Sequence, residues 1–221
     1  MTAKHQLRTL LRSITPEPLL RIRQNIALYN WYSKTHCAPP APHFVKQGVL
    51  LRHGIKNCTW IETGTYLGST TKLLASKYFH VHTIEPSQKC LSIAKDYLGD
   101  LKNITYYHGT SEDCIETACA AVAGDVCFWL DGHYSTGITF RGNTDTPIMH
   151  ELAVIEKHLS RYRSVVVMID DVRCSHLDSD HYPNLNFYVD WSNRNHLNWI
   201  IEHDAFIAKS KNLDVYPGAM Y

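Results

Sequence analysis

The sequence has no excess of charge of either sign. Its 22 Lys and Arg residues stand against 21 Asp and Glu residues, which gives a formal net charge of +1 at neutral pH. Without a global basic field, the chain has no general means of attracting a polyanion, so a nucleic-acid partner is not expected. A structured RNA is left open as a substrate, but a small molecule is the expected one.

The sequence also lacks cysteine pairs and long apolar runs. Its seven cysteines form no Cys-x-x-Cys pair, which is typical of small buried side chains in a reducing compartment rather than of a disulfide framework or a zinc site. The run "VVVMI" is far too short to cross a bilayer. The first residues, "MTAKHQLRTLLRSI", have no continuous apolar segment like that of a signal peptide. We therefore expect a cytoplasmic protein.

A third absence concerns the glycine-rich turn of dinucleotide-binding enzymes. The segment "IETGTYLGSTT" places three residues between Gly64 and Gly68, whereas the dinucleotide fingerprint requires Gly-x-Gly-x-x-Gly to admit a pyrophosphate. This spacing argues against a nicotinamide-dependent oxidoreductase, which stays as the alternative enzyme class.

The amino-terminal part is predicted to be helical. Residues 3–14 carry leucines and an isoleucine at helical spacing opposite basic residues, and a second helix is expected from about residue 16 to 32. We assign residues 1–42 to this helical extension and residues 43–221 to the main domain. The apolar stripe would pack onto the core or onto a second subunit, giving a homo-oligomer. The alternative is peripheral contact with a membrane surface, because basic residues oppose the leucine face.

From residue 43 the pattern alternates between helices and strands. The expected strands are apolar on both faces and separated by helices, which predicts an α/β, doubly wound, mostly parallel sheet covered on two sides. The last two strands are joined only by "HD", too short for a parallel crossover, so the seventh must run antiparallel. The seven expected strands span residues 58–62, 80–85, 104–108, 126–130, 164–169, 197–202 and 204–209.

Residues that follow the first three strands suit a nucleoside cofactor, since ligands of such sheets bind at the carboxyl ends of the strands. Gly64 and Gly68 allow close backbone approach, and the next helix offers free N–H groups. Glu85 ends the second strand, where a carboxylate can accept hydrogen bonds from both ribose hydroxyls. Thr110 and Ser111 follow the third strand near the expected adenine, although helix capping explains Ser111 equally well.

In combination these residues resemble the cofactor motifs of class I S-adenosylmethionine-dependent methyltransferases, over residues 58–209. The resemblance implies a sheet of order 3-2-1-4-5-7-6, with the methionine part near Glu62 and Gly64, the ribose on Glu85 and the adenine near Thr110 and Ser111. The predicted cofactor-binding residues are Glu62, Gly64, Thr65, Gly68, Ser69, Glu85, Thr110, Ser111 and Asp131.

Three aspartates follow the next two strands. Asp131 ends the fourth strand, while Asp170 and Asp171 end the fifth, its neighbour in the expected order. Crowded carboxylates repel one another and are commonly neutralised by a hard divalent cation, so Mg²⁺ is predicted. The alternative pairs Asp171 with Arg173 and leaves Asp131 to hold the ammonium group of the cofactor. The three aspartates are similar to the metal ligands of macrocin O-methyltransferase-type enzymes, which implies the same role here.

The segment after Asp131 departs from that family. His133 stands where the family commonly has a second acid, and an imidazole with an ordinary pKa near 6.5 is available as a base. Asp131 and His133 are therefore the predicted catalytic residues. Residues 134–146, rich in glycine and threonine, suit a lid over a polar substrate, with Tyr134 and Arg141 in contact with it. The alternative is a solvated loop.

These residues predict an S-adenosylmethionine-dependent O-methyltransferase. The acceptor would be a hydroxyl of a small polar molecule, with a sugar or glycosylated metabolite preferred. Aligning oxygen, methyl carbon and sulfur can supply about 7–11 kcal/mol of the barrier. Besides the oxidoreductase, the remaining alternative is a non-catalytic cofactor-binding protein that uses its amino-terminal helices for assembly.

Overall fold

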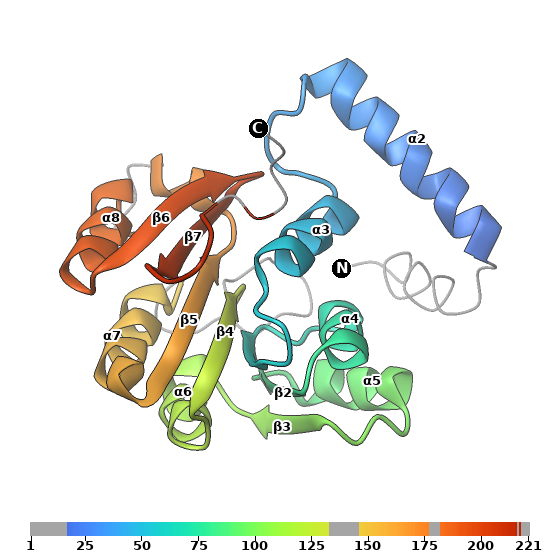
Figure 1. The fold of residues 1–221 in the computed structure, drawn as a ribbon. Helices are drawn as coiled ribbons and strands as arrows, with labels where there is room; N and C mark the ends of the chain where they lie inside the picture. The colour runs from blue at the N-terminus through green and yellow to red at the C-terminus, as the bar shows by residue number, and fades with distance from the viewer. Residues whose placement is uncertain (1–16, 133–145, 177–181, 216, 218–221) are drawn as a thin grey trace.

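The protein contains one seven-stranded sheet (Figure 1). The computed structural model describes residues 17–132, 146–176, 182–215 and 217. The strand order is β3-β2-β1-β4-β5-β7-β6, which confirms the order implied by the resemblance. The first five strands are parallel, and β7 runs antiparallel to both β5 and β6. The strands are β1 (Thr59–Thr63), β2 (His80–Glu85), β3 (Ile104–His108), β4 (Gly124–Leu130), β5 (Tyr162–Ile169), β6 (Leu197–Glu202) and β7 (Ala205–Ser210).

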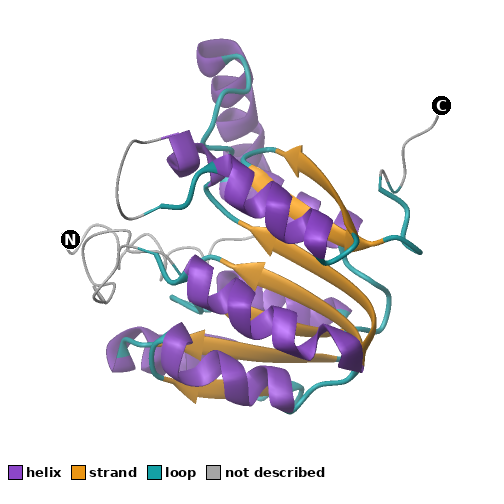
Figure 2. Cartoon of the chain, turned by 90° about the vertical axis from the view of Figure 1, so that its left-hand side faces the viewer, coloured by secondary structure: helices purple, strands orange, loops and turns teal. Residues whose placement is uncertain are grey.

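Helices cover both faces of the sheet (Figures 1 and 2). Successive residues of β4 point to opposite faces of the sheet, and each face is covered by a core cluster. The strand is therefore apolar on both sides. Phe128 packs with Leu152 and Trp191 in one core cluster, whereas Trp129 packs with Leu74 in the other. The helices of the main domain are α3 (His43–His53), α4 (Ser69–Lys77), α5 (Gln88–Leu98), α6 (Ser111–Ala120), α7 (Ile148–His158) and α8 (Leu185–Arg194).

The helix α2 (Glu17–Thr35) extends away from the sheet (Figure 1). The indole of Trp31, near its carboxyl end, is buried and donates a hydrogen bond to the Ala38 carbonyl over 2.7 Å. Four apolar side chains lie along the rest of the helix, each more than half exposed, namely Leu19, Ile22, Ile26 and Tyr29. The helix predicted over residues 3–14 lies outside the described residues. Among the described helices, none combines the length and the apolar character needed to cross a bilayer.

The β6–β7 hairpin was expected from its short connection, and its turn has a further effect on the site. His203 and Asp204 both adopt positive φ angles, 46° and 71°, as a tight two-residue hairpin turn requires. The Asp204 carbonyl accepts a hydrogen bond from the Val172 amide (3.0 Å), and its Oδ1 accepts one from the Arg173 amide (2.9 Å). The turn therefore brings a buried carboxylate next to the segment that follows β5.

Candidate functional site

The glycine turn after β1 is held tightly between β2 and β4. Gly64 has a φ of +86°, and a Cβ atom there would lie 2.5 Å from the Asp131 carbonyl oxygen. The amides of Gly64 and Thr65 both donate to the Ile84 carbonyl, at 3.0 and 3.1 Å. Gly68, with a φ of +81°, directly precedes α4. Only glycine fits at position 64 without strain, because both the backbone angle and the adjacent carbonyl exclude a side chain.

Glu85 fixes this turn from the end of β2. Its Oε2 accepts a hydrogen bond from the Tyr66 amide (2.8 Å), and its Oε1 accepts one from the Ser87 amide (2.9 Å). Burial raises the pKa of this carboxyl, while the two amides partly offset the effect. A carboxylate oxygen can accept more than one hydrogen bond. Glu85 thus retains acceptor capacity for the ribose hydroxyls predicted at this position.

Glu62 supports the same turn from inside the core. Its Oε2 accepts hydrogen bonds from Thr71 (2.6 Å) and Thr83 (2.7 Å), and the Thr65 hydroxyl contacts that of Thr83 over 2.6 Å. The side chain of Thr65 is therefore part of this buried network. Burial raises the pKa of Glu62 to about 7, with Asp131 and Glu85 contributing in the same direction. Its Oε1 is buried and has no hydrogen-bond partner among the described residues.

The raised pKa of Glu62 makes the stability of the protein depend on pH. The unfolded carboxyl ionises near pH 4.5 and the folded one near pH 7, so this group lowers the free energy of unfolding as pH rises between those values. At about 1.4 kcal/mol per pH unit, the full effect is roughly 3 kcal/mol. We expect Glu62→Gln to remove this part of the decline, as measured by urea denaturation at about pH 5 and pH 8.

The control for this prediction is Asp100→Asn, since the Asp100 side chain is fully exposed. It should leave the pH dependence of the wild type unchanged. If Glu62→Gln and the wild type lose stability equally with rising pH, the assignment of the effect to Glu62 is wrong.

The residues predicted near the adenine begin α6. Thr110, rather than Ser111, caps this helix, because its hydroxyl accepts a hydrogen bond from the Asp113 amide over 3.3 Å. Ser111 is buried in the first turn. The alternative in which Ser111 caps the helix is therefore wrong, because the preceding residue, Thr110, is the cap.

A second buried acid, Glu151 on α7, was not predicted. Burial raises its pKa to about 7, and the hydroxyls of Ser111 and Thr63 partly offset this. Its Oε1 has no hydrogen-bond partner among the described residues, and it lies 3.4 Å from where a Cβ of Gly132 would be. In the sequence Glu151 is one polar residue in an amphipathic helix, so nothing there indicated its position.

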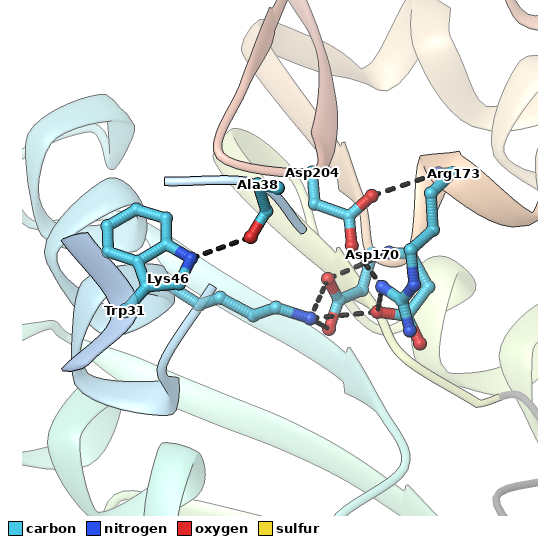
Figure 3. Close-up of polar contacts among 7 residues, drawn as sticks. Trp31, Ala38, Lys46, Asp170, Arg173 and Asp204 are labelled. Atoms are coloured by element: carbon cyan, nitrogen blue, oxygen red, sulfur yellow. Dashed lines mark hydrogen bonds and ion pairs between the residues drawn. The ribbon is translucent and has the colours of Figure 1, made fainter. Parts of the chain in front are cut away.

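A lysine donates hydrogen bonds to both aspartates of the pair after β5 (Figure 3). The Lys46 ammonium, from α3, donates to both carboxylate oxygens of Asp170 at 2.6 and 2.7 Å and to Oδ1 of Asp171 at 2.8 Å. Burial and the charge of Asp131 raise the pKa of Asp170, which the ammonium counteracts. Lys46 was not predicted as part of the site, because a lysine on an amphipathic helix usually faces solvent.

Arg173 supplies a second cation to the same cluster. Its guanidinium donates to Oδ1 of Asp171 over 2.5 Å and also to Oδ2 of Asp204. The alternative reading of the sequence, in which Arg173 pairs with Asp171, is thereby confirmed. The participation of Asp204 was not predicted, because it depends on the hairpin turn.

These contacts bear on the predicted magnesium site. Among the described residues, the acidic group whose ligand atoms all lie within 4.8 Å of one another consists of Asp170, Asp171 and Asp204, without Asp131. The predicted ligand set of Asp131, Asp170 and Asp171 shares two members with this group, and the place of Asp131 in it stays a prediction. Two side-chain cations, Lys46 and Arg173, already pair with these carboxylates, so the residues do not fit the predicted divalent cation.

Helix α3 connects the two halves of the site. Nε2 of His43 lies 3.3 Å from Oγ of Ser69, one of the predicted cofactor-binding residues. Lys46 follows His43 by three residues and therefore shares its face of the helix. One turn of α3 thus contacts both the start of α4 and the acidic cluster.

Asp131 is half-buried at the end of β4, and its amide donates to the Thr63 carbonyl over 3.2 Å. The predicted base His133 and the predicted substrate contacts Tyr134 and Arg141 lie outside the described residues.

Solved structures of methyltransferases are similar to this chain. A putative methyltransferase from Streptococcus mutans in complex with SAH has a TM-score of 0.50 and 16% identity, over 78% of this chain and 98% of that one. The N-methyltransferase NodS from Bradyrhizobium japonicum gives 0.51 and 12%, over 75% and 93% of the two chains. A putative rRNA-methylase from Clostridium thermocellum gives 0.50 and 12%, over 75% and 94%.

The similarity to these proteins is one of structure. No protein-family model and no curated protein matches the sequence. None of the three structures is described as a macrocin O-methyltransferase, so that narrower resemblance stays a prediction. At identities this low, the structural similarity establishes the fold alone. The chain has the Rossmann-like fold of the class I methyltransferases.

Proposed function

We propose that the protein is an S-adenosylmethionine-dependent methyltransferase. The observation that carries the proposal is the turn from Gly64 to Gly68, which Glu85 fixes from β2 and the Asp131 carbonyl confines from β4. The turn leads into α4 at the carboxyl edge of the sheet, where ligands of such folds bind. The spacing of its glycines disfavours a pyrophosphate-containing dinucleotide.

The residues around the turn fit S-adenosylmethionine. Glu85 retains lone pairs for the ribose hydroxyls. The buried Oε1 of Glu62 lacks a hydrogen-bond partner among the described residues, beside the position expected for the methionine part. Asp131 is the carboxylate proposed to hold its ammonium, and Thr110 and Ser111 are proposed to border the adenine. When bound, the cofactor would supply the methyl group as a sulfonium donor.

The proposed acceptor is a hydroxyl of a small polar molecule, preferably a sugar or a glycosylated metabolite. The composition of residues 134–146 supports it, because their threonines can hydrogen-bond a polyol and Arg141 can bind an anionic group. In this proposal His133 accepts the hydroxyl proton, a role typically worth about 10²–10⁴-fold in rate.

Two measurements test the proposal. Calorimetry of the full chain should detect binding of S-adenosylhomocysteine and no binding of NAD⁺ or NADH. The opposite result would assign the protein to the oxidoreductases. Methylation assays should show turnover of sugar nucleotides or glycosides, increasing with pH through about 6.5 if a neutral imidazole is the base. Turnover of catechols alone would overturn the acceptor class, and cofactor binding without turnover of any acceptor would favour the non-catalytic alternative.

The stripe on α2 supports a second subunit as a partner. Leu19, Ile22, Ile26 and Tyr29 follow one another at spacings of three, four and three residues, the pattern by which two like helices pack together. We therefore extend the proposal to a homodimer formed through this stripe. Light scattering of the full chain should give twice the monomer mass, while a monomer that binds lipid vesicles would favour the membrane alternative.

A further inference from the structure

The acidic cluster at the end of β5 has the geometry of a metal site but already contains its cations. Asp170, Asp171 and Asp204 are all buried, and each offers an oxygen within 4.8 Å of the others. Lys46 and Arg173 both donate hydrogen bonds into this group (Figure 3). Three carboxylates therefore face two fixed positive charges.

Lys46 binds carboxylate oxygens that a metal ion at this cluster would need as ligands. Its ammonium has three N–H donors and lies within 2.8 Å of three carboxylate oxygens of Asp170 and Asp171. Its side chain is only 12% exposed, so the ammonium is committed to the cluster rather than to solvent. A divalent cation prefers the same oxygens at about 2.0–2.6 Å, and it cannot coordinate them while the ammonium is in place.

The charge balance points in the same direction. Among the described residues, Lys46 and Arg173 bring two positive charges to the three negative charges of the carboxylates. A divalent ion would then bring an excess of positive charge into a buried region, where like charges repel strongly. Without Lys46, the cluster would hold two uncompensated negative charges, which is the usual setting for a divalent cation.

We propose that Lys46 is a built-in replacement for the metal ion of this site, so that the protein binds no divalent cation there and transfers methyl groups without one. Methyl transfer without a metal rests on the proposed function, whereas the exclusion of a divalent cation by Lys46 does not. Lys46 is a positioning residue, which holds Asp170 and Asp171 at the carboxyl edge of the sheet. Through His43, the same turn of α3 contacts Ser69 beside the proposed cofactor site.

The test uses Mn²⁺ as a paramagnetic probe, titrated into the full chain and followed by electron paramagnetic resonance. The wild type should leave Mn²⁺ free, with a Kd weaker than about 1 mM. Lys46→Met, which removes the ammonium but keeps an apolar stem, should bind one Mn²⁺ at least about tenfold more tightly. The double variant Lys46→Met with Asp170→Asn should lose this binding again, because it lacks a ligand.

Matched variants separate the role of Lys46 from a general loss of charge. Lys72→Met removes a lysine of α4 that lies over the ring of Tyr97 on α5, and this variant should leave Mn²⁺ free as the wild type does. Lys46→Arg keeps a cation at the cluster and should also leave Mn²⁺ free. Circular dichroism establishes that each variant is folded.

Two results would overturn the proposal. The first is stoichiometric Mn²⁺ binding by the wild type at micromolar concentration, a measurement that requires no variant to fold. The second is a folded Lys46→Met variant that binds no Mn²⁺, because the ammonium would then not be what excludes the metal. The rate of methyl transfer should be the same in a chelator and in Mg²⁺. The affinity for S-adenosylhomocysteine, measured in parallel, tests the proposed function separately from the exclusion of the metal.

Discussion

Replacing Gly64 with alanine should weaken S-adenosylhomocysteine binding by roughly 100-fold or more and lower the free energy of unfolding by about 2–4 kcal/mol. Both effects have one cause. Alanine is strained at a φ of +86°, and its Cβ would lie 2.5 Å from the Asp131 carbonyl oxygen. The turn must therefore move away from β4, which displaces the backbone that is proposed to approach the cofactor. Calorimetry and urea denaturation measure the two effects.

The chain offers a matched control for this substitution. Gly48 lies inside α3, and a Cβ built on it would meet no atom within 4 Å. Gly48→Ala should therefore leave cofactor affinity unchanged and stabilise the protein by about 0.5–1 kcal/mol, because alanine favours the helix. If Gly64→Ala binds S-adenosylhomocysteine as tightly as Gly48→Ala does, the turn is not the cofactor site.

The second large effect is expected for Glu85→Gln, which should weaken S-adenosylhomocysteine binding by roughly 10- to 100-fold. The substitution removes the charge that strengthens hydrogen bonds from the ribose hydroxyls. It also turns an amide NH₂ toward either the Tyr66 or the Ser87 N–H, so one of the two backbone bonds is lost. Calorimetry of the folded variant measures the affinity.

Asp96→Asn is the control for Glu85→Gln, because Asp96 is an exposed carboxylate on the neighbouring helix α5. It carries the same change of charge and should bind the cofactor as the wild type does. An equal loss of affinity in both variants would mean that the general electrostatic field matters and that Glu85 has no specific role.

The fold could be predicted from the sequence because its signals are local. Strands apolar on both faces, such as "VCFWL" and "VVVMI", indicate a covered parallel sheet, and the short β6–β7 connection requires an antiparallel pair. The positions of Gly64 and Glu85, which are proposed to border the cofactor, could be read in the same way, since they lie at the ends of β1 and β2.

The acidic cluster could not be predicted in the same way, because its members come from distant parts of the chain. Asp170 and Asp171 were identified from the end of β5, but Lys46 and Asp204 enter through tertiary contacts of α3 and of the hairpin turn. A lysine and an aspartate at a helix and a turn look like surface residues in the sequence. The charge balance that disfavours a metal ion is therefore visible only in the folded chain.

The hairpin turn has a consequence for how the protein is made. Asp204 is synthesised more than thirty residues after Asp171, yet its carboxylate and carbonyl hold Arg173 and Val172 in place. During translation, Arg173 and the aspartate pair must emerge from the ribosome before their last partner exists. Because contacts between distant residues form late in folding, this corner of the molecule should mature only after the hairpin has been added to the sheet.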